Sequence, residues 1–316
     1  MSTLNSTTLQ PLTFLLTVIP GMDASQVWIS IPFCILYAIA FTGNSMIMFV
    51  VIHERSLHAP MYYFLSMLSA TDLSLSLCNL STTLGVLWFD VREISFDACL
   101  AQMFFLHSFT LVESGVLLAM AFDHFIAICN PLRCANILTK TRIIQIGLAV
   151  WVRVIAVNTP TVLLVKRLSF CQERVLSRSY CFHIDIVKLS CTDNRINRIM
   201  GLFVIFSTSG IDFPCIVISY ALIIRSVLSI ASPDERKKVF NTCISHISAV
   251  AIFFIPLMSL SITHRYGHSL PQFVHTLAAN IFLLIPPVLN PIIYSVKTKQ
   301  IRRVIIKIFH RMLTCI

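Results

Sequence analysis

The residues best suited to chemistry are polar side chains that interrupt long apolar stretches of the sequence. Four of them, two acids and two amides, are Asn44, Asp72, Glu113 and Asn290. Burying such groups in apolar surroundings is costly, so we expect them to face the interior of the protein. Two acids with little base nearby indicate either a bound cation or protonation of one acid. A structural network of hydrogen bonds between helices is the alternative.

A second candidate site lies within Met120–Cys134, which reads MAFDHFIAICNPLRC. Here an apolar segment runs into Asp123 and His124 and then into a basic exit. Two further charges, Arg153 and Asp212, also interrupt apolar stretches, and the sequence around them gives neither one a role. The helices or strands that carry these residues must therefore hold polar side chains inside apolar surroundings.

Composition indicates that those elements lie in a membrane. Of the 316 residues, 56% are hydrophobic and 12% are charged, and the mean hydropathy is +0.82. A soluble domain of this length could not hide so many apolar side chains in one core. Lipid is therefore the expected solvent.

Seven apolar stretches are each long enough to cross a hydrocarbon layer of roughly 30 Å as a helix rising about 1.5 Å per residue. Helix is favoured over strand because lipid offers the backbone no partners and because the stretches lack the alternation of a membrane barrel. We therefore expect an all-α membrane protein, a seven-helix bundle. Its transmembrane domain covers residues 27–296, with spans near 27–52, 61–89, 100–129, 143–165, 199–228, 239–262 and 273–296.

The distribution of Lys and Arg predicts the orientation. Most of them fall in short loops and in the tail on one side of the spans, and the positive-inside rule makes this side cytoplasmic. Residues 1–26 are then extracellular, and residues 297–316 form a cytoplasmic tail. The net charge of +10 is explained by topology and inner-leaflet lipid, without a nucleic-acid partner. Apolar positions recur at helical spacing between Ile301 and Met312, which predicts an amphipathic helix on the membrane, with a frayed tail as the alternative.

Cysteines and a sequon mark the outer side. Cys99, Cys171, Cys181 and Cys191 all fall there, in an oxidising compartment. Four cysteines allow two disulfides, and the sequence does not choose among the three pairings. Asn5 begins an Asn-Ser-Thr sequon, which predicts a glycosylated outer segment.

Several motifs, met in the right order along the chain, resemble the olfactory receptors, which are rhodopsin-like G-protein-coupled receptors. The family reads close to MAFDRYVAICNPLRY where this chain has Met120–Cys134. The departures there are His124 for Arg and Cys134 for Tyr, while Phe125 stands where Tyr or Phe is usual. The other matching motifs are Gly43-Asn44, Ser69-Ala70-Thr71-Asp72, Glu113-Ser114, Ser219-Tyr220, 238–246 (KVFNTCISH) and 286–294 (PPVLNPIIY). The phrase His264-Arg265-Tyr266-Gly267 is similar to the class I, fish-like branch.

The resemblance implies a multi-pass plasma-membrane receptor, and not an enzyme. Such a receptor binds a small volatile odorant and activates a heterotrimeric G protein of the stimulatory olfactory type, which raises cAMP. The family's disulfides imply the pairs Cys99–Cys181 and Cys171–Cys191. The four interior polar residues resemble the centre in which paired acids can hold sodium, and no other cofactor is expected.

The expected ligand site lies at the outer side. Arg265 ends the sixth span, and His183 follows the loop cysteine that should be tethered over the pocket. Two cations beside an apolar cavity would suit an aliphatic carboxylic acid, since an Arg fork binds a carboxylate and apolar residues accept the alkyl tail. Class I receptors for such acids resemble this arrangement, with Ser261 one turn below the Arg and Gly201 on the fifth span. For Arg265 the alternative is an anchor to lipid phosphate, and for His183 taken by itself a solvated loop histidine is the favoured interpretation.

The cytoplasmic switch departs from the family pattern at His124. In the family an Arg there pairs at rest with the residue matching Asp123 and later reaches into the G protein, and Tyr220 and Tyr294 belong to the same switch. His is shorter, has fewer donors and is mostly neutral at its ordinary pKa of about 6.5. Loss of the resting pair could raise basal signalling, and loss of the Arg contact could weaken coupling. We expect weakened but not absent coupling, and a receptor-shaped protein without signalling is the alternative.

Other protein classes fit less well. A transporter would show pseudo-symmetric halves with paired broken helices, and no such repeat is visible. A channel would need charges repeated along one face of a pore. An enzyme would need a catalytic motif, and the sequence contains no nucleophile elbow, HExxH zinc motif or phosphate loop.

Overall fold

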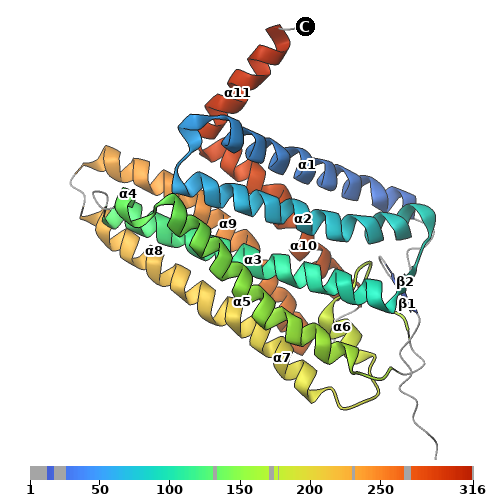
Figure 1. Cartoon of the computed structure of the whole chain (residues 1–316). Coiled ribbons are helices and arrows are strands. Elements are labelled where there is room, and N and C mark those ends of the chain that lie inside the picture. The colour runs from blue at the N-terminus through green and yellow to red at the C-terminus, as the bar shows by residue number, and fades with distance from the viewer. Residues whose placement is uncertain are drawn as a thin grey trace, which may run out of the picture.

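The computed structural model describes residues 13–17, 26–130, 134–170, 174–176, 178–229, 232–266 and 272–314. Most of them lie in long helices that run up and down beside one another (Figure 1). The long helices are α1 (Gln26–His53), α2 (Pro60–Phe89), α3 (Phe96–Cys129), α5 (Lys140–Lys166), α9 (Pro233–Tyr266) and α10 (Gln272–Lys297). A further long segment joins α7 (Arg195–Ile205), the π-helical η4 (Phe206–Asp212) and α8 (Phe213–Leu228). The shorter elements are β1 (Thr13–Leu15), η2 (Arg55–Leu57), β2 (Glu93–Ser95), α4 (Cys134–Ile137), α6 (His183–Lys188) and α11 (Lys299–Thr314).

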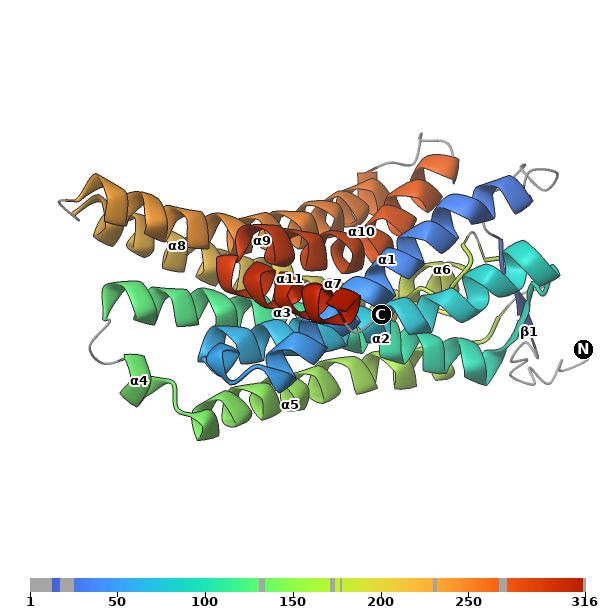
Figure 2. The same ribbon diagram turned by 90° about the horizontal axis from the view of Figure 1, so that it is seen from above.

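The two ends of the bundle carry different elements. At one end β1 pairs with β2 in antiparallel register, with Phe14 opposite Ile94, and α6 lies at the same end (Figures 1 and 2). This end also contains the Cys99–Cys181 bond and is called the disulfide end below. At the other end α1, α3 and α10 finish and α11 begins, and it is called the tail end.

Within the described residues, six helical segments are long and apolar enough to cross a membrane. They include all the long segments except α2, which is rich in Ser and Thr and therefore less hydropathic. α2 is nevertheless 30 residues long and packs against both α1 and α3. The seven long segments form one bundle, which confirms the predicted fold class. Some helices extend beyond the predicted spans, since α9 begins at Pro233 and α5 at Lys140.

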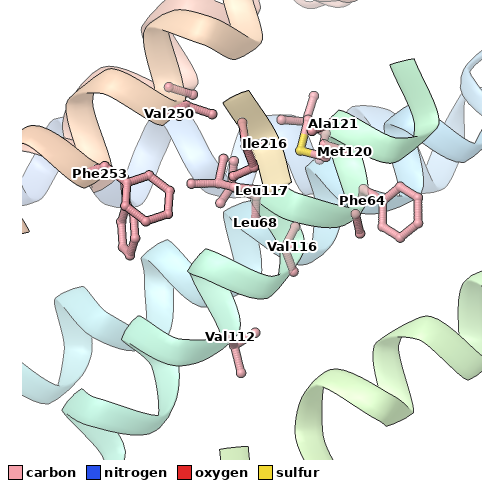
Figure 3. Packing of buried hydrophobic residues seen from close by; sticks show 14 of the residues in the cluster. Phe64, Leu68, Val112, Val116, Leu117, Met120, Ala121, Ile216, Val250 and Phe253 are labelled. Atoms are coloured by element: carbon pink, nitrogen blue, oxygen red, sulfur yellow. The ribbon is translucent and has the colours of Figure 1, made fainter. Parts of the chain in front are cut away.

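α3 is the central element of the bundle. In the apolar stretch of α3 that could cross a membrane, 72% of the residues are buried inside the protein. The corresponding share is 28% for α5 and for the α7–α8 segment. Figure 3 shows its apolar side chains, among them Val116 and Leu117, packed beside Leu68 of α2, Ile216 of α8 and Phe253 of α9. Polar residues placed on α3 are consequently enclosed by protein rather than by lipid.

The amphipathic helix predicted in the tail is present as α11. Ile301 is fully buried, and Val304, Ile305 and Ile308 pack against the same apolar core. The Tyr62 hydroxyl at the start of α2 also hydrogen bonds to the side chain of Gln300 in the first turn of α11. α11 therefore attaches to the tail end of the bundle through its apolar face.

The π-helical segment η4 widens the helix between α7 and α8. A Cβ atom at Gly210 would lie 2.5 Å from Cδ2 of the Phe206 ring, so a larger residue at this position would require the exposed Phe206 ring to move. π-Helical turns change the direction of the residues around them and occur often at functional sites. Here η4 ends at Asp212, whose side chain is completely buried.

Candidate functional site

The disulfide end is organised around the bond between Cys99 in the first turn of α3 and Cys181 in the loop after α5. The pairing is the one that the resemblance implied. The Cys181 amide donates a hydrogen bond to Gln102 Oε1 at 2.9 Å, so the loop is held along α3 by two adjacent contacts. Cys191 is also disulfide-bonded, whereas Cys171 lies outside the described residues.

The loop carries His183 into the protein interior. His183 begins α6, and its ring centroid lies 6.3 Å from that of His107 on α3. A Cβ atom at Gly201 on α7 would lie 3.1 Å from Cε1 and 3.2 Å from Nδ1 of the His183 ring. The structure therefore brings two predicted ligand residues, His183 and Gly201, together. It adds His107, which sequence reasoning missed although an ionisable ring inside the third apolar stretch was a signal.

The expectation of a solvated loop histidine at position 183 is wrong, since this side chain is only 6% exposed. Burial lowers the pKa of His183 to about 4. The imidazole is consequently neutral near pH 7, and the second cation expected beside Arg265 is not formed. Its Nε2 atom is buried and has no hydrogen-bond partner within the described part of the chain. A neutral imidazole presents one donor and one acceptor, so this nitrogen is available to a ligand.

The remaining predicted ligand residues lie on α9. Ser261 is half-buried, and its hydroxyl donates to the Leu257 carbonyl at 2.9 Å, which leaves the hydroxyl oxygen able to accept. Arg265 lies in the last turn of the same helix, and its side chain is outside the described ones, as is the sequon at Asn5.

A buried ion pair organises the loop around this site. Arg178 Nε lies 3.2 Å from Asp185 Oδ2, and both side chains are under a tenth exposed. The Arg178 guanidinium also stands 4.8 Å from the ring centroid of Phe182, in cation–π geometry. Burial raises the pKa of the neighbouring Tyr180 to about 12, so its phenol stays neutral. Sequence reasoning missed this pair because Arg178 and Asp185 read as ordinary charges of a hydrated loop.

The interior polar residues meet between α1, α2, α3 and α10. Asn290 Nδ2 donates to Asp72 Oδ2 at 3.0 Å, and Glu113 is close enough to interact with both. Asn44 Nδ2 donates to the Pro287 carbonyl at 2.8 Å, which ties α1 to α10. All four polar side chains are at most 3% exposed. The structure therefore unites in one centre the set that the sequence singled out.

One oxygen on each of these four side chains is buried and has no hydrogen-bond partner among the described residues: Asn44 Oδ1, Asp72 Oδ1, Glu113 Oε1 and Asn290 Oδ1. Carboxylate and amide oxygens are the donors that hard cations prefer. The donor set therefore fits such an ion. No cluster of three or more His, Cys, Asp and Glu side chains arranged for a metal occurs in the described ranges.

The tail end contains the predicted switch. The His124 ring stacks on that of His246 on α9, with centroids 5.2 Å apart and planes 19° from parallel. His124 Nδ1 donates to the Met120 carbonyl at 2.6 Å. His246 Nδ1 forms a 2.6 Å hydrogen bond with the Tyr220 hydroxyl on α8. These rings connect α3, α9 and α8, and sequence reasoning missed the contribution of His246 despite its ionisable ring inside the sixth apolar stretch.

Asp123 and Tyr294 complete the switch region. Asp123 is 6% exposed and forms no ion pair with His124 in the part of the chain that the structure describes. Tyr294 on α10 is buried and close enough to Tyr220 to interact with it. It also interacts with Asp72 of the polar centre. Tyr294 thus lies between the polar centre and the aromatic stack of the tail end.

The two charges to which the sequence gave no role form a site with each other. Arg153 on α5 meets Asp212 of η4 through two parallel hydrogen bonds, Nη1 to Oδ1 and Nη2 to Oδ2, each 2.7 Å long. Ser114 on α3 donates its hydroxyl to Asp212 Oδ2 at 2.6 Å. The cluster joins α3, α5 and η4 inside the bundle. Its members lie too far apart in sequence for their spacing to predict the contact.

The family comparison matches nearly the whole chain. A family model described as "Olfactory receptor" matches residues 33–312. Olfactory receptor 51F2 from Homo sapiens is 69% identical over 98% of this chain and 90% of its own length. Olfactory receptor OR51C1 from Homo sapiens is 61% identical over 94% of this chain and 95% of its own length. Olfactory receptor 51E2 from Mus musculus is 51% identical over 94% of this chain and 93% of its own length.

The fold is similar to that of a solved structure. Squid rhodopsin superposes with a TM-score of 0.74 at 18% sequence identity, covering 97% of this chain and 93% of the rhodopsin chain. At this identity the comparison bears on the fold alone.

Proposed function

Because this chain belongs to the olfactory receptor family, in its class I branch, we propose that it detects aliphatic carboxylic acids and signals through the stimulatory olfactory G protein to raise cAMP. Family membership itself establishes the coarser function. The protein is an odorant-sensing G-protein-coupled receptor of the plasma membrane, with several membrane-crossing helices, a small-molecule ligand and a G-protein partner. It is not an enzyme.

The observation that carries the acid proposal is the buried Nε2 of His183 beside Gly201, which has no hydrogen-bond partner among the residues that the structure describes. A neutral imidazole can donate one hydrogen bond to a carboxylate oxygen without bringing a second charge into the interior. Arg265, in the last turn of α9, supplies the cation in this proposal, one helical turn beyond Ser261. The apolar face of α3 then receives the alkyl chain of the acid.

The acid proposal is tested by cAMP accumulation in cells that display the receptor, with a panel of acids, alcohols and esters of matched chain length. We expect responses to acids, and loss of most of them in Arg265→Ala. Arg195→Ala is the matched control, because Arg195 is an exposed arginine at the same end, paired with Asp193. If acid responses persist in Arg265→Ala at normal surface expression, the proposal that Arg265 binds the carboxylate is wrong.

Weakened coupling is the second part of the proposal, and His124 supports it. The imidazole stacks on His246 and cannot present the five donors of an arginine to a G protein. Restoring the family residue with His124→Arg should raise the odorant-driven cAMP maximum at matched surface expression. If the native chain gives no cAMP with any odorant while the variant responds, the receptor binds odorant without coupling. If the odorant-driven cAMP maximum is the same in His124→Arg as in the native chain, His124 is not the cause of weak coupling.

We also propose that sodium binds the polar centre of Asn44, Asp72, Glu113 and Asn290, whose oxygens fit it. Sodium would be tested by thermal unfolding in sodium and in choline chloride at equal ionic strength. The native chain should be stabilised by sodium and Asp72→Asn should not, whereas equal curves for the native chain would exclude the ion.

The proposed orientation places the disulfide end outside the cell and the tail end in the cytoplasm, with α11 on inner-leaflet lipid. It includes a sugar on Asn5 and a Cys171–Cys191 bond. Glycosidase digestion of the native chain and of Asn5→Gln tests this orientation, because a sugar is added only on the outer side. A mobility shift in the native chain alone is expected, and modification of an engineered tail sequon would reverse the assignment.

A further inference from the structure

A cavity of about 320 Å³ opens at the tail end, beside α3, α4 and the first turns of α5. The residues that line it are mainly apolar: Phe122, Ile137, Leu138, Ile146 and Ala149, with Arg142 and Gln145 as the polar members. It lies at the opposite end of the bundle from His183 and Gly201. The odorant site therefore does not account for it, and none of the switch residues Asp123, His124, Tyr220 and Tyr294 lines it.

The cavity opens on the surface that faces lipid. Phe122 is 45% exposed, and Ile144 and Leu148 of α5 are each 60% exposed. Exposed apolar side chains on a membrane-crossing helix contact hydrocarbon, because no water is present at that depth. The walls of the cavity continue this apolar face, so a molecule that enters it comes from the bilayer.

Arg142 adds a positive charge to the cavity. Its Nη1 donates to the Ile137 carbonyl at 3.0 Å, and its backbone amide donates to Thr139 Oγ1 at 3.4 Å. The first bond uses one of the five guanidinium donors and holds the exposed side chain across the cavity edge. Lys140, an exposed residue two positions before Arg142, does not line the cavity but adds a second positive charge at the start of α5. A cationic edge above apolar walls complements a molecule with an anionic head and a hydrocarbon chain.

We propose that this cavity binds an anionic phospholipid of the inner leaflet, with an acyl chain between α3 and α5 and its phosphate on Arg142. Arginine forms charge-assisted hydrogen bonds to phosphate, and anionic lipids are concentrated in the cytoplasmic leaflet. Ligand cavities in proteins begin at about 300 Å³, so the volume suits part of one chain. The inference rests on the cytoplasmic orientation proposed for the tail end, and it is independent of the odorant.

Native mass spectrometry of the full chain in detergent tests this proposal, with phosphatidylglycerol and phosphatidylcholine of identical acyl chains as probes. We expect phosphatidylglycerol to bind more tightly. Arg142→Ala should weaken its binding about fivefold, the effect of one basic residue at an anionic membrane surface. Ala149→Phe should weaken both lipids, because the exposed Ala149 lines the cavity and a larger ring there fills it. Arg55→Ala, an exposed arginine of η2 at the same end, is the control and should bind like the native chain.

Three results would overturn the site. Equal binding of the two lipids, or native affinity in Arg142→Ala, would show that no headgroup is recognised there. Native affinity in Ala149→Phe would show that the chain does not enter the cavity. The assay uses neither odorant nor G protein, so its failure would leave the acid proposal standing. Failure of the cAMP assay would in turn leave the lipid site standing.

Discussion

Arg153 and Asp212 form a two-pronged ion pair between α5 and the π-helical segment η4, with both nitrogen-to-oxygen distances at 2.7 Å. Asp212 is fully enclosed, while the Arg153 side chain is 31% exposed. Each charge alone would be costly inside a membrane. Pairing therefore explains how two charges are held in this bundle. Because Ser114 of α3 also hydrogen bonds to Asp212, the cluster connects α3, α5 and η4.

Breaking this pair should destabilise the receptor. Arg153→Gln leaves the fully buried Asp212 charge without its partner, a change that typically costs about 3 to 5 kcal/mol. The double change Arg153→Leu with Asp212→Leu should lose less than the two single Leu changes combined, because no unpaired charge remains. Thermal unfolding of purified receptor measures the effect. Asp90→Asn, which breaks the exposed Arg92–Asp90 pair, is the control and should cost under about 1 kcal/mol. Additive losses in the double variant would contradict the coupling.

Gly201→Ala should impair odorant recognition more than folding. The added methyl group would approach the His183 ring to 3.1 Å, so the ring must shift by a few tenths of an ångström. A shift of this size at a hydrogen-bonding ligand contact should raise the half-maximal acid concentration roughly tenfold, the loss of about 1.4 kcal/mol. Dose–response curves in the cAMP assay measure it. Gly147→Ala is the control, because its new methyl group would meet the flexible end of Met67 at an ordinary 3.4 Å. Equal dose–response curves for the two variants would show that Gly201 does not lie at the ligand site.

His246→Phe should raise basal signalling. The aromatic ring keeps its stacking area against His124 but loses the hydrogen bond to Tyr220, worth about 1 kcal/mol. If that bond holds α8 and α9 together at the tail end, its loss shifts the equilibrium toward an open tail end by about fivefold. Ligand-free cAMP at matched surface expression measures this shift. Ser248→Ala, which removes a hydroxyl that bonds only to the Ile244 carbonyl of its own helix among the described residues, should leave basal cAMP unchanged. A native basal level in His246→Phe would mean that the bond does not restrain the bundle.

Acid should destabilise the disulfide end through His183. Burial holds the pKa of this imidazole at about 4 in the folded receptor, against about 6.5 when unfolded. Between these values the unfolded chain binds the extra proton, so stability is lost as pH falls from 6.5 toward 4. From pH 7.5 to pH 5 the contribution of this group amounts to about 2 kcal/mol. Unfolding temperatures at the two pH values measure the loss, and His183→Gln should reduce the difference between them. An identical pH dependence in that variant would show that other groups titrate instead.

Local sequence properties were sufficient to predict the architecture. In lipid, an apolar stretch of membrane length satisfies its backbone hydrogen bonds by forming a helix. The repeat of apolar residues from Ile301 to Met312 likewise predicted the amphipathic α11. The polar set that includes Asp72 and Asn290 was recognised for the same reason, because a polar group in an apolar stretch must face protein. The family resemblance added the Cys99–Cys181 pairing, which the sequence alone left among three choices.

Only the tertiary structure decided how the charged and titratable groups are used. His183 reads as a loop residue, yet the disulfide tether and α6 bury it and make it neutral. His124 reads as a weakened ion-pair partner, yet it stacks on His246, more than a hundred residues away in sequence. Arg153 and Asp212 are 59 residues apart, and their contact depends on the helical turn that η4 widens. Burial and partnership depend on how whole helices pack against one another, and no local pattern carries that information.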